Sequence, residues 1–258
     1  MKHLRVVICA WVLAAAPALS AAQNPSCLAD PNRHAQLAEQ DAAQLYDLQA
    51  RYGMREITER THAIFDRLVR AQLAVDETSY AFDWRLAGYG ALGLNAHAMH
   101  TGKIVITQGL DSPDVPEEIV AASLAHEIAH VVMRHGLAQA CFALQIVNPM
   151  SSLRQAQTDL MQEVWSSGQE LGNRVRSLAH AHELQADAKA VELLRRTGYP
   201  NNSMSNLLVF LASRHTPAQF WPSGSHPDHQ LRLAKVKEVE TLQIRTDVQP
   251  RMAKNRTR

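Results

Sequence analysis

The sequence predicts an α+β fold that is mainly helical and has one small β-sheet or hairpin. Apolar residues recur at helical spacing through most of the chain, whereas the alternation typical of strands is confined to residues 80–107. The chain has 258 residues, 46% of them hydrophobic, and no long Gly, Pro or Ser tract. It is therefore most simply interpreted as one domain with a full core.

Residues 1–22 are typical of a secretory signal peptide. Lys2 and Arg5 precede an apolar run over residues 6–19, and small residues follow before the chain turns polar at Gln23. An uncleaved membrane anchor is the alternative, but the run has about 14 residues and about 20 are needed to span a bilayer. We therefore expect cleavage after Ala22 and a periplasmic or secreted location.

Charge and cysteine content fit that location. Removing residues 1–22 takes away Lys2, Arg5 and no acidic residue, so 26 basic and 25 acidic residues become 24 and 25, a net charge of −1. This balance does not suggest nucleic-acid binding. Cys27 and Cys141 remain, an even pair where disulfides persist. A bridge and two separate thiols both stay open, because the sequence does not place their Cα atoms within about 4.4–6.8 Å.

The first half of the chain is expected to hold two helices followed by short strands. Residues 32–73 carry apolar residues at helical spacing, and Gly53 separates two helices. In residues 80–86, Tyr80, Phe82 and Trp84 alternate with other residues, which indicates a strand with an aromatic face. Residues 94–99 and 103–107 are expected to form two more strands, joined as a hairpin or sheet edge.

A buried helix over residues 115–135 is predicted at the centre of the fold. Asp114 is the expected N-cap and Gly136 the expected stop, and the helix is apolar nearly all round. Beyond it we expect an irregular connection over residues 141–150, helices over 153–171, 174–197, 205–213 and 230–242, and a flexible basic tail over 245–258.

The central helix carries the string His126-Glu127-Ile128-Ala129-His130. Residues four apart share one face of a helix, so His126 and His130 can bind one Zn²⁺ while Glu127 lies beside it. A hydrogen-bonded histidine pair is one alternative, and a structural zinc site, which prefers cysteine ligands, is another. A catalytic zinc site typically has three protein ligands, so a third ligand is expected downstream.

Glu183 is the best candidate for that third ligand. It lies on a predicted helix, one turn before Asp187, whose carboxylate can accept the second ring N–H of a histidine ligand. The competing pattern H-E-x-x-H-x-x-G-x-x-H fails, because its glycine position is Met133 and its last histidine position is Gly136.

Other histidines are treated as packing or solvated residues, with one exception. The exception is His226, which lies in a loop after the two motif helices and can face the metal, either stabilising an oxyanion or closing the open zinc position. The remaining candidates are interpreted as hydrogen-bonded or exposed side chains: His97, His100, His135, His180 and His182.

Taken together, these motifs resemble the HtpX-like, CAAX-prenyl-protease-like and Oma-type zinc metallopeptidases. The resemblance is carried by residues 126–135, by Glu183 with Asp187, by Asn95-Ala96 with 102–104, and by His226-Pro227 with Arg232, in the family's order. The apparent lack of a membrane helix makes the soluble periplasmic, BepA-like branch the closest fit. Members of that branch often carry a helical-repeat domain behind the protease, whereas this chain ends soon after Arg232.

The resemblance implies a zincin (gluzincin) domain over residues 23–244 with one Zn²⁺ per subunit. It implies zinc ligands at His126, His130 and Glu183, a catalytic base at Glu127, a supporting or proton-donating role for Asp187, and a substrate cleft bordered by the strands at 95–107.

The expected function is a metalloendopeptidase acting on misfolded or unassembled envelope proteins, with peripheral association with the envelope assembly machinery. A zinc-binding, chaperone-like assembly factor with little turnover is the alternative, and a zinc hydrolase of non-peptide amides is a second one.

Overall fold

A computed structural model describes residues 25–91, 93–166, 169–214 and 227–254. The predicted signal peptide, residues 1–22, lies outside these ranges. The elements along the chain are α2 (Pro25–Ala29), α3 (Pro31–Tyr52), β1 (Met54–Arg55), α4 (Glu59–Leu73), the short 3-10 helix η1 (Glu77–Ala81), β2 (Arg85–Tyr89), β3 (Ala96–Ala98), β4 (Lys103–Thr107), α5 (Glu117–Val132), α6 (His135–Ile146), α7 (Leu153–Ser166), α8 (Gln169–Arg196), α9 (Ser203–Ser213) and α10 (His229–Lys254). Within the described ranges, no helix combines the length and apolarity needed to cross a membrane. The mainly helical α+β class is confirmed.

The sheet has four strands in the order β1-β2-β4-β3. β2 runs parallel to β4 with Leu86 opposite Ile104, and β3 runs antiparallel to β4 with His97 opposite Val105. β1 pairs antiparallel with β2. The hairpin expected from residues 94–99 and 103–107 is confirmed, and β3 forms one edge of the sheet.

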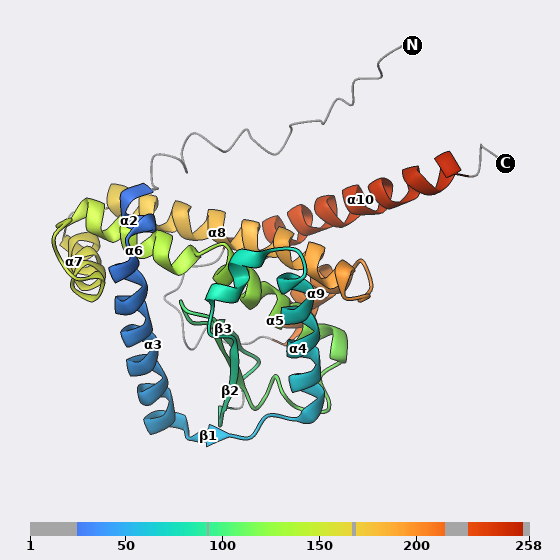
Figure 1. The fold of residues 1–258 in the computed structure, drawn as a ribbon, viewed down its shortest axis with the longest axis horizontal. Helices are drawn as coiled ribbons and strands as arrows, with labels where there is room; N and C mark the ends of the chain where they lie inside the picture. Colours follow the sequence, from blue (N-terminus) through green and yellow to red (C-terminus); the bar gives the residue numbers. More distant parts are fainter. Residues whose placement is uncertain (1–24, 92, 167–168, 215–226, 255–258) are drawn as a thin grey trace, which may run out of the picture.

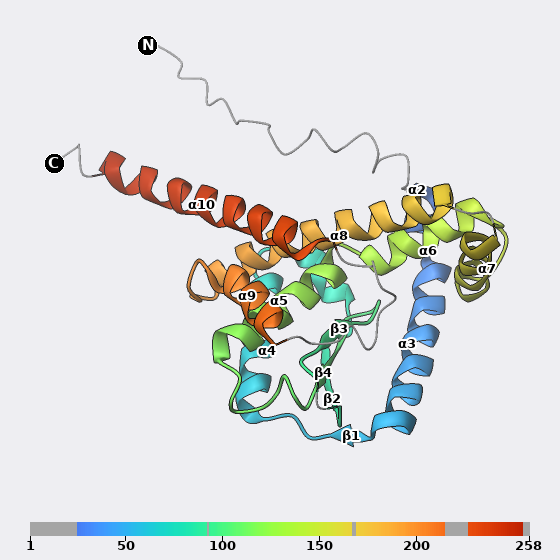
Figure 2. The ribbon, with the colours of Figure 1, turned by 180° about the vertical axis from the view of Figure 1, so that it is seen from behind.

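The helices enclose this small sheet. α3 and α4 stand on opposite sides of it, and α8 crosses one end of the molecule (Figure 1). α5 packs against α4, α8 and α9 as well as against β3 and β4. The last turns of α10 extend away from the other elements in both views (Figure 2). Because α5 is central, side chains on its surface can lie between the edge of the sheet and α8.

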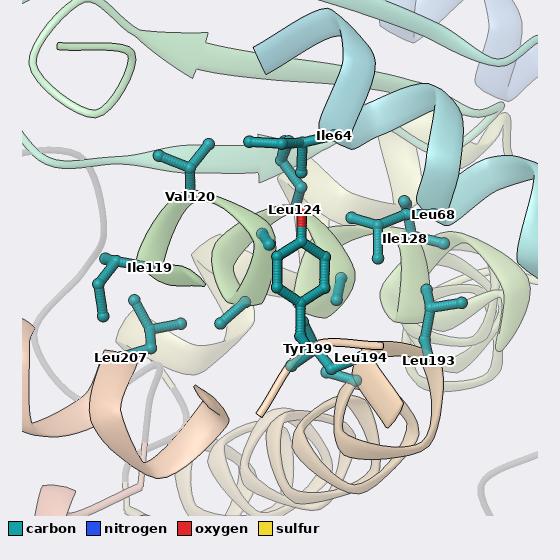
Figure 3. Packing of buried hydrophobic residues seen from close by; sticks show 14 of the residues in the cluster. Ile64, Leu68, Ile119, Val120, Leu124, Ile128, Leu193, Leu194, Tyr199 and Leu207 are labelled. Atoms are coloured by element: carbon teal, nitrogen blue, oxygen red, sulfur yellow. The ribbon is translucent and has the colours of Figure 1, made fainter. Parts of the chain in front are cut away.

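The main core is built around α5 (Figure 3). Its side chains Ile119, Val120, Leu124 and Ile128 lie between α4 on one side and α8 and α9 on the other, and all are at most 3% exposed. Helix α5 is apolar on nearly every face, as predicted, and it is buried accordingly. This burial fixes the position of the polar residues that interrupt its apolar surface.

A second core lies at the other end of α8, and a disulfide closes it. Cys27 of α2 is bonded to Cys141 of α6 with Cα atoms 5.9 Å apart, so of the two alternatives left open by the sequence the structure shows the bridge. The cluster also contains Leu37 of α3 and Leu153 of α7. The bridge therefore ties the N-terminal helices to the helix that follows α5.

Helix α3 is anchored to the β3–β4 turn by a buried carboxylate. Asp41 is fully buried and accepts hydrogen bonds from the backbone N–H groups of His100 and Thr101 and from the Thr101 hydroxyl. Its other contact is His100 Nδ1, at 2.8 Å. Burial raises the pKa of Asp41, but the hydrogen bonds from His100 and Thr101 outweigh burial and lower it. The carboxylate is therefore held ionised beside the turn.

The aromatic alternation at residues 80–86 predicts a strand too early in the chain. Residues 77–81 form the helix η1, which Asp76 caps by accepting from the N–H of Thr78, and the strand β2 begins only at Arg85. Tyr80 is 70% exposed, so the aromatic residues do not share one buried face. Local capping hydrogen bonds decide the conformation there.

The central helix is also shorter than the sequence predicts. Helix α5 starts after Pro116 with no side-chain cap, so Asp114 is not its N-cap. The chain turns at Arg134, which has a left-handed backbone with φ of 56°, and α6 starts at once. Gly136 thus lies inside α6 instead of stopping α5. Residues 141–146, expected to be irregular, are helical and mostly buried.

The four predicted C-terminal helices are present, but α7 ends at Ser166 instead of residue 171, and the others start earlier than predicted. Helix α8 begins at Gln169 instead of near residue 174, and α10 continues to Lys254 instead of ending near residue 242. The flexibility predicted for the tail stays a prediction. The domain limit near residue 244 is likewise a prediction, and the helix runs through it without a break.

Candidate metal centre

Three side chains from two helices converge on one point. His126 and His130 of α5 and Glu183 of α8 place one nitrogen or oxygen each within 4.8 Å of one another. His126 Nε2 lies 3.1 Å from His130 Nε2, and the Glu183 oxygens lie 3.5 and 3.4 Å from these two nitrogens. The three ligands predicted from the sequence are therefore brought together, and they could hold a metal ion.

The donor set fits a catalytic zinc ion. Two imidazoles and one carboxylate are the ligands of a known type of catalytic zinc site, which leaves a position for water or substrate. The second nitrogen of each imidazole is turned to another partner, so both Nε2 atoms face the same space. Burial lowers the pKa of His126, but Asp187 and Glu183 outweigh burial and raise it to about 10. The two carboxylates thus favour a positive charge at this place.

Asp187 supports His126 from behind and is itself held by Arg232. Its Oδ1 lies 2.9 Å from His126 Nδ1, and the Arg232 guanidinium of α10 donates to both carboxylate oxygens at 2.9 and 2.7 Å. Burial raises the pKa of Asp187, but His126 and Arg232 outweigh burial and lower it. Asp187 thus carries a negative charge aimed at a ring that faces the site. A separate Arg232 nitrogen lies 3.3 Å from Glu183.

Glu127 lies between the site and the edge of the sheet. Its Oε2 accepts a 2.7 Å hydrogen bond from the backbone N–H of Ala98 in β3. In the antiparallel ladder, alternate residues of β3 turn their backbone groups toward β4, and Met99 and His97 occupy those positions. Ala96 and Ala98 therefore turn their backbone groups outward, toward the side on which Glu127 lies.

The far side of His130 is occupied by a group that the sequence motif does not predict. His130 Nδ1 lies 3.0 Å from His135 Nδ1, and His135 Nε2 lies 3.1 Å from Gln185 Oε1 of α8. The His182 ring is stacked on His135, with centroids 4.2 Å apart and planes at 8°. Burial, with His182 and His130 nearby, lowers the pKa of His135 to about 2. His135 is thus a neutral ring at neutral pH.

The other histidines considered in the sequence lie in different environments. His226 lies outside the described residues, so its predicted place near the metal stays a prediction. His97 is buried and contacts Gln44, and the partly exposed His100 contacts Asp41, as expected of packing residues. The sequence offered no signal for the contact of His135 with His130, because it depends on the left-handed turn at Arg134. Arg232 belongs to the motifs that carry the family resemblance, but the sequence does not predict its bond to Asp187.

The fold and this centre define a class of protein. Two histidines on a buried helix, a glutamate between them and a third ligand from a second helix are the arrangement of a metal-dependent hydrolase. The sequence model of peptidase family M48 matches residues 57–240, which include every residue of the centre and most of the chain. The chain belongs to peptidase family M48 and is a metallopeptidase. A search of curated proteins finds no match.

Proposed function

We propose that this chain is a zinc-dependent metalloendopeptidase of the cell envelope, belonging to the soluble periplasmic, BepA-like branch of its family. The observation that carries the catalytic part is the convergence of His126, His130 and Glu183 beside Glu127. When bound there, a zinc ion supplies the Lewis acidity that activates water and polarises the substrate carbonyl.

Glu127 is the proposed general base. It lies on α5 between the two histidines in sequence, and its hydrogen bond from the Ala98 N–H holds one carboxylate oxygen toward the sheet edge. The other oxygen is left to take a proton from the attacking water and to pass it to the leaving amine. Asp187 holds the His126 ring through Nδ1, a positioning role that its contact with Arg232 stabilises.

The substrate is proposed to lie extended along β3. This strand is the sheet edge next to α5. The outward backbone groups of Ala96 and the outward C=O of Ala98, whose N–H is bonded to Glu127, can pair with a peptide backbone. Backbone pairing selects an extended chain and not a particular side chain. This supports unfolded or unassembled envelope proteins as substrates, with peripheral contact to the envelope assembly machinery.

Two features support export. Residues 1–22 have the pattern of a signal peptide, and Cys27 forms a disulfide with Cys141, a bond that persists outside the cytoplasm. The protein recovered from the envelope fraction is expected to begin at Gln23. Recovery of the chain with residues 1–22 attached, in the cytoplasmic fraction, would contradict this part of the proposal.

The decisive experiment compares wild type with Glu127→Gln for zinc content and for cleavage of an unfolded model protein. The variant is expected to keep one zinc per chain and to lose cleavage by about 10²–10⁴-fold, the usual contribution of a general base. Glu59→Gln, an exposed residue at the start of α4, is the matched control and should cleave normally. Full activity of Glu127→Gln would refute the mechanism.

The same experiment separates the chaperone-like alternative. A holdase would keep the model protein from aggregating without cutting it, and Glu127→Gln would act as well as wild type. A peptidase would produce fragments with wild type only.

A further inference from the structure

We propose that His135 is a positioning residue that holds the ligand His130 in the form able to bind the metal. Its Nδ1 accepts the Nδ1–H of His130, and its own Nε2–H is anchored on Gln185. This inference rests on the proposed function, because it takes His130 as a zinc ligand.

The positions of the ring nitrogens determine where the hydrogens lie. His130 turns Nε2 toward His126 and Glu183, so a neutral His130 that binds metal through Nε2 must carry its hydrogen on Nδ1. That Nδ1 lies 3.0 Å from His135 Nδ1, which must then be the acceptor. A neutral His135 that accepts at Nδ1 carries its hydrogen on Nε2.

Gln185 is the last acceptor in this chain of hydrogen bonds. Its Oε1 can only accept, and it lies 3.1 Å from His135 Nε2. Every atom along His130, His135 and Gln185 thus has a role consistent with the next one. The reverse order would put the hydrogen of His130 on Nε2, where the metal binds. The arrangement therefore favours the ligating tautomer of His130 over the other one.

The fold holds His135 in place from several directions. The left-handed turn at Arg134 brings residue 135 back against the helix that it has just left. The ring is buried, with 3% of the residue exposed, and the stacked His182 ring covers one face of it. His182 in turn lies 3.4 Å from the Gln139 side chain. A ring held this firmly can orient its neighbour.

The two ligand histidines therefore have different supports. His126 meets a carboxylate, Asp187, which a guanidinium clamps, whereas His130 meets a neutral imidazole that an amide anchors. Partners of this kind set ligand orientation, and their loss typically costs about 10–100-fold in metal affinity or activity. His135 is thus assigned a role beyond packing.

The test measures zinc affinity of the full chain without its leader by competition with a chromophoric chelator. His135→Phe keeps a planar ring but removes the acceptor, and we expect zinc affinity to fall by about 10–100-fold. His135→Asn places an amide oxygen near the position of Nδ1 and should bind zinc clearly more tightly than the Phe variant. His62→Phe makes the same ring replacement at an exposed position of α4 and should bind zinc like wild type.

A second measurement does not depend on the folding of any variant. Ring ¹⁵N spectra of the zinc-loaded wild-type protein are expected to show hydrogen on Nδ1 of His130 and on Nε2 of His135. A hydrogen on Nδ1 of His135 overturns the inference. So does wild-type affinity in His135→Phe, an Asn variant as weak as the Phe variant, or an equal loss in His62→Phe.

These outcomes are distinguishable from failure of the proposed function. A wild-type protein that takes up no zinc overturns both proposals. A wild type that binds one zinc and cleaves its substrate, together with any of the contrary results above, overturns only the role of His135.

Discussion

Removing the Arg232 guanidinium should destabilise the protein even when no metal is bound. The guanidinium donates two hydrogen bonds to Asp187; the Asp187 side chain is buried, with 2% exposed, and that of Arg232 is mostly covered, with 13% exposed. In Arg232→Met the carboxylate keeps its contact with His126 but loses its cation. An ionised group that remains in the interior without this partner is costly.

The magnitude follows from the geometry. A hydrogen bond to a charged group contributes about 1.5–3 kcal/mol, and two are lost. Breaking a buried ion pair by removing one partner costs about 3–5 kcal/mol, which agrees. We therefore expect a fall of about 4 kcal/mol in the free energy of unfolding. For a chain of this size, that corresponds to a drop of about 8–16 °C in Tm.

The assay is denaturant unfolding of the metal-free protein under non-reducing conditions. Arg232→Met, Asp187→Asn and the double variant form a thermodynamic cycle, and a coupling free energy above about 2 kcal/mol is expected for a buried, bidentate pair. Lys235→Met is the control on the same helix, because Lys235 and Glu238 are 51% and 62% exposed and such a pair contributes at most about 1 kcal/mol. A coupling free energy between Arg232 and Asp187 below about 1 kcal/mol, the most that such an exposed pair contributes, would refute the reasoning.

Three further predictions concern the scaffold around the centre. Asp41→Asn should lower the free energy of unfolding by about 2–4 kcal/mol at pH 7. Because the pKa of Asp41 is lowered on folding, the stability that its carboxylate contributes is present above the unfolded pKa of about 3.9 and is lost as pH falls. A stability difference between variant and wild type that does not change with pH would contradict this reasoning. Replacing Cys27 and Cys141 together with Ser should cost about 2–5 kcal/mol in denaturant unfolding, since the bridge closes a loop with a sequence separation of 114, and unchanged stability would argue against the bond. Gly136→Ala should lower the free energy of unfolding by about 1–3 kcal/mol, measured as a fall in Tm, because the added Cβ would lie 2.4 Å from the His100 ring that Asp41 holds. An unchanged Tm would show that this ring can move.

Most residues of the metal centre could be predicted from their local spacing along the chain. His126 and His130 lie one turn apart on a helix whose apolar residues predict burial, and Glu183 and Asp187 repeat the same spacing on a second helix. Periodicity of 3.6 residues is a property of the backbone alone, so both pairs could be placed on helix faces without knowing the fold. The hairpin of β3 and β4 was predictable because its pattern is also local, two short apolar runs joined by a glycine-containing turn.

Features that depend on contacts between distant residues could not be predicted. Residues 141–146 were expected to be irregular, yet they are helical because α6 is buried against α2, α3 and α7, which the sequence does not place. The aromatic alternation before β2 was misleading for a different, local reason, because the cap that Asp76 provides to Thr78 outweighs it. Pairing of Cys27 with Cys141 was open because only the packing of α2 on α6 brings them together.

The sequence by itself determined which residues could bind a metal and on which helices they lie. Only the tertiary structure decided how these residues are supported: that Asp187 is clamped by Arg232 from α10, that Glu127 is held by the Ala98 N–H, and that His130 meets His135. The physical reason is the separation along the sequence between the residues that must meet. Ligand spacing is set within one helical turn, whereas each support joins two elements whose contact depends on the folding of the whole core.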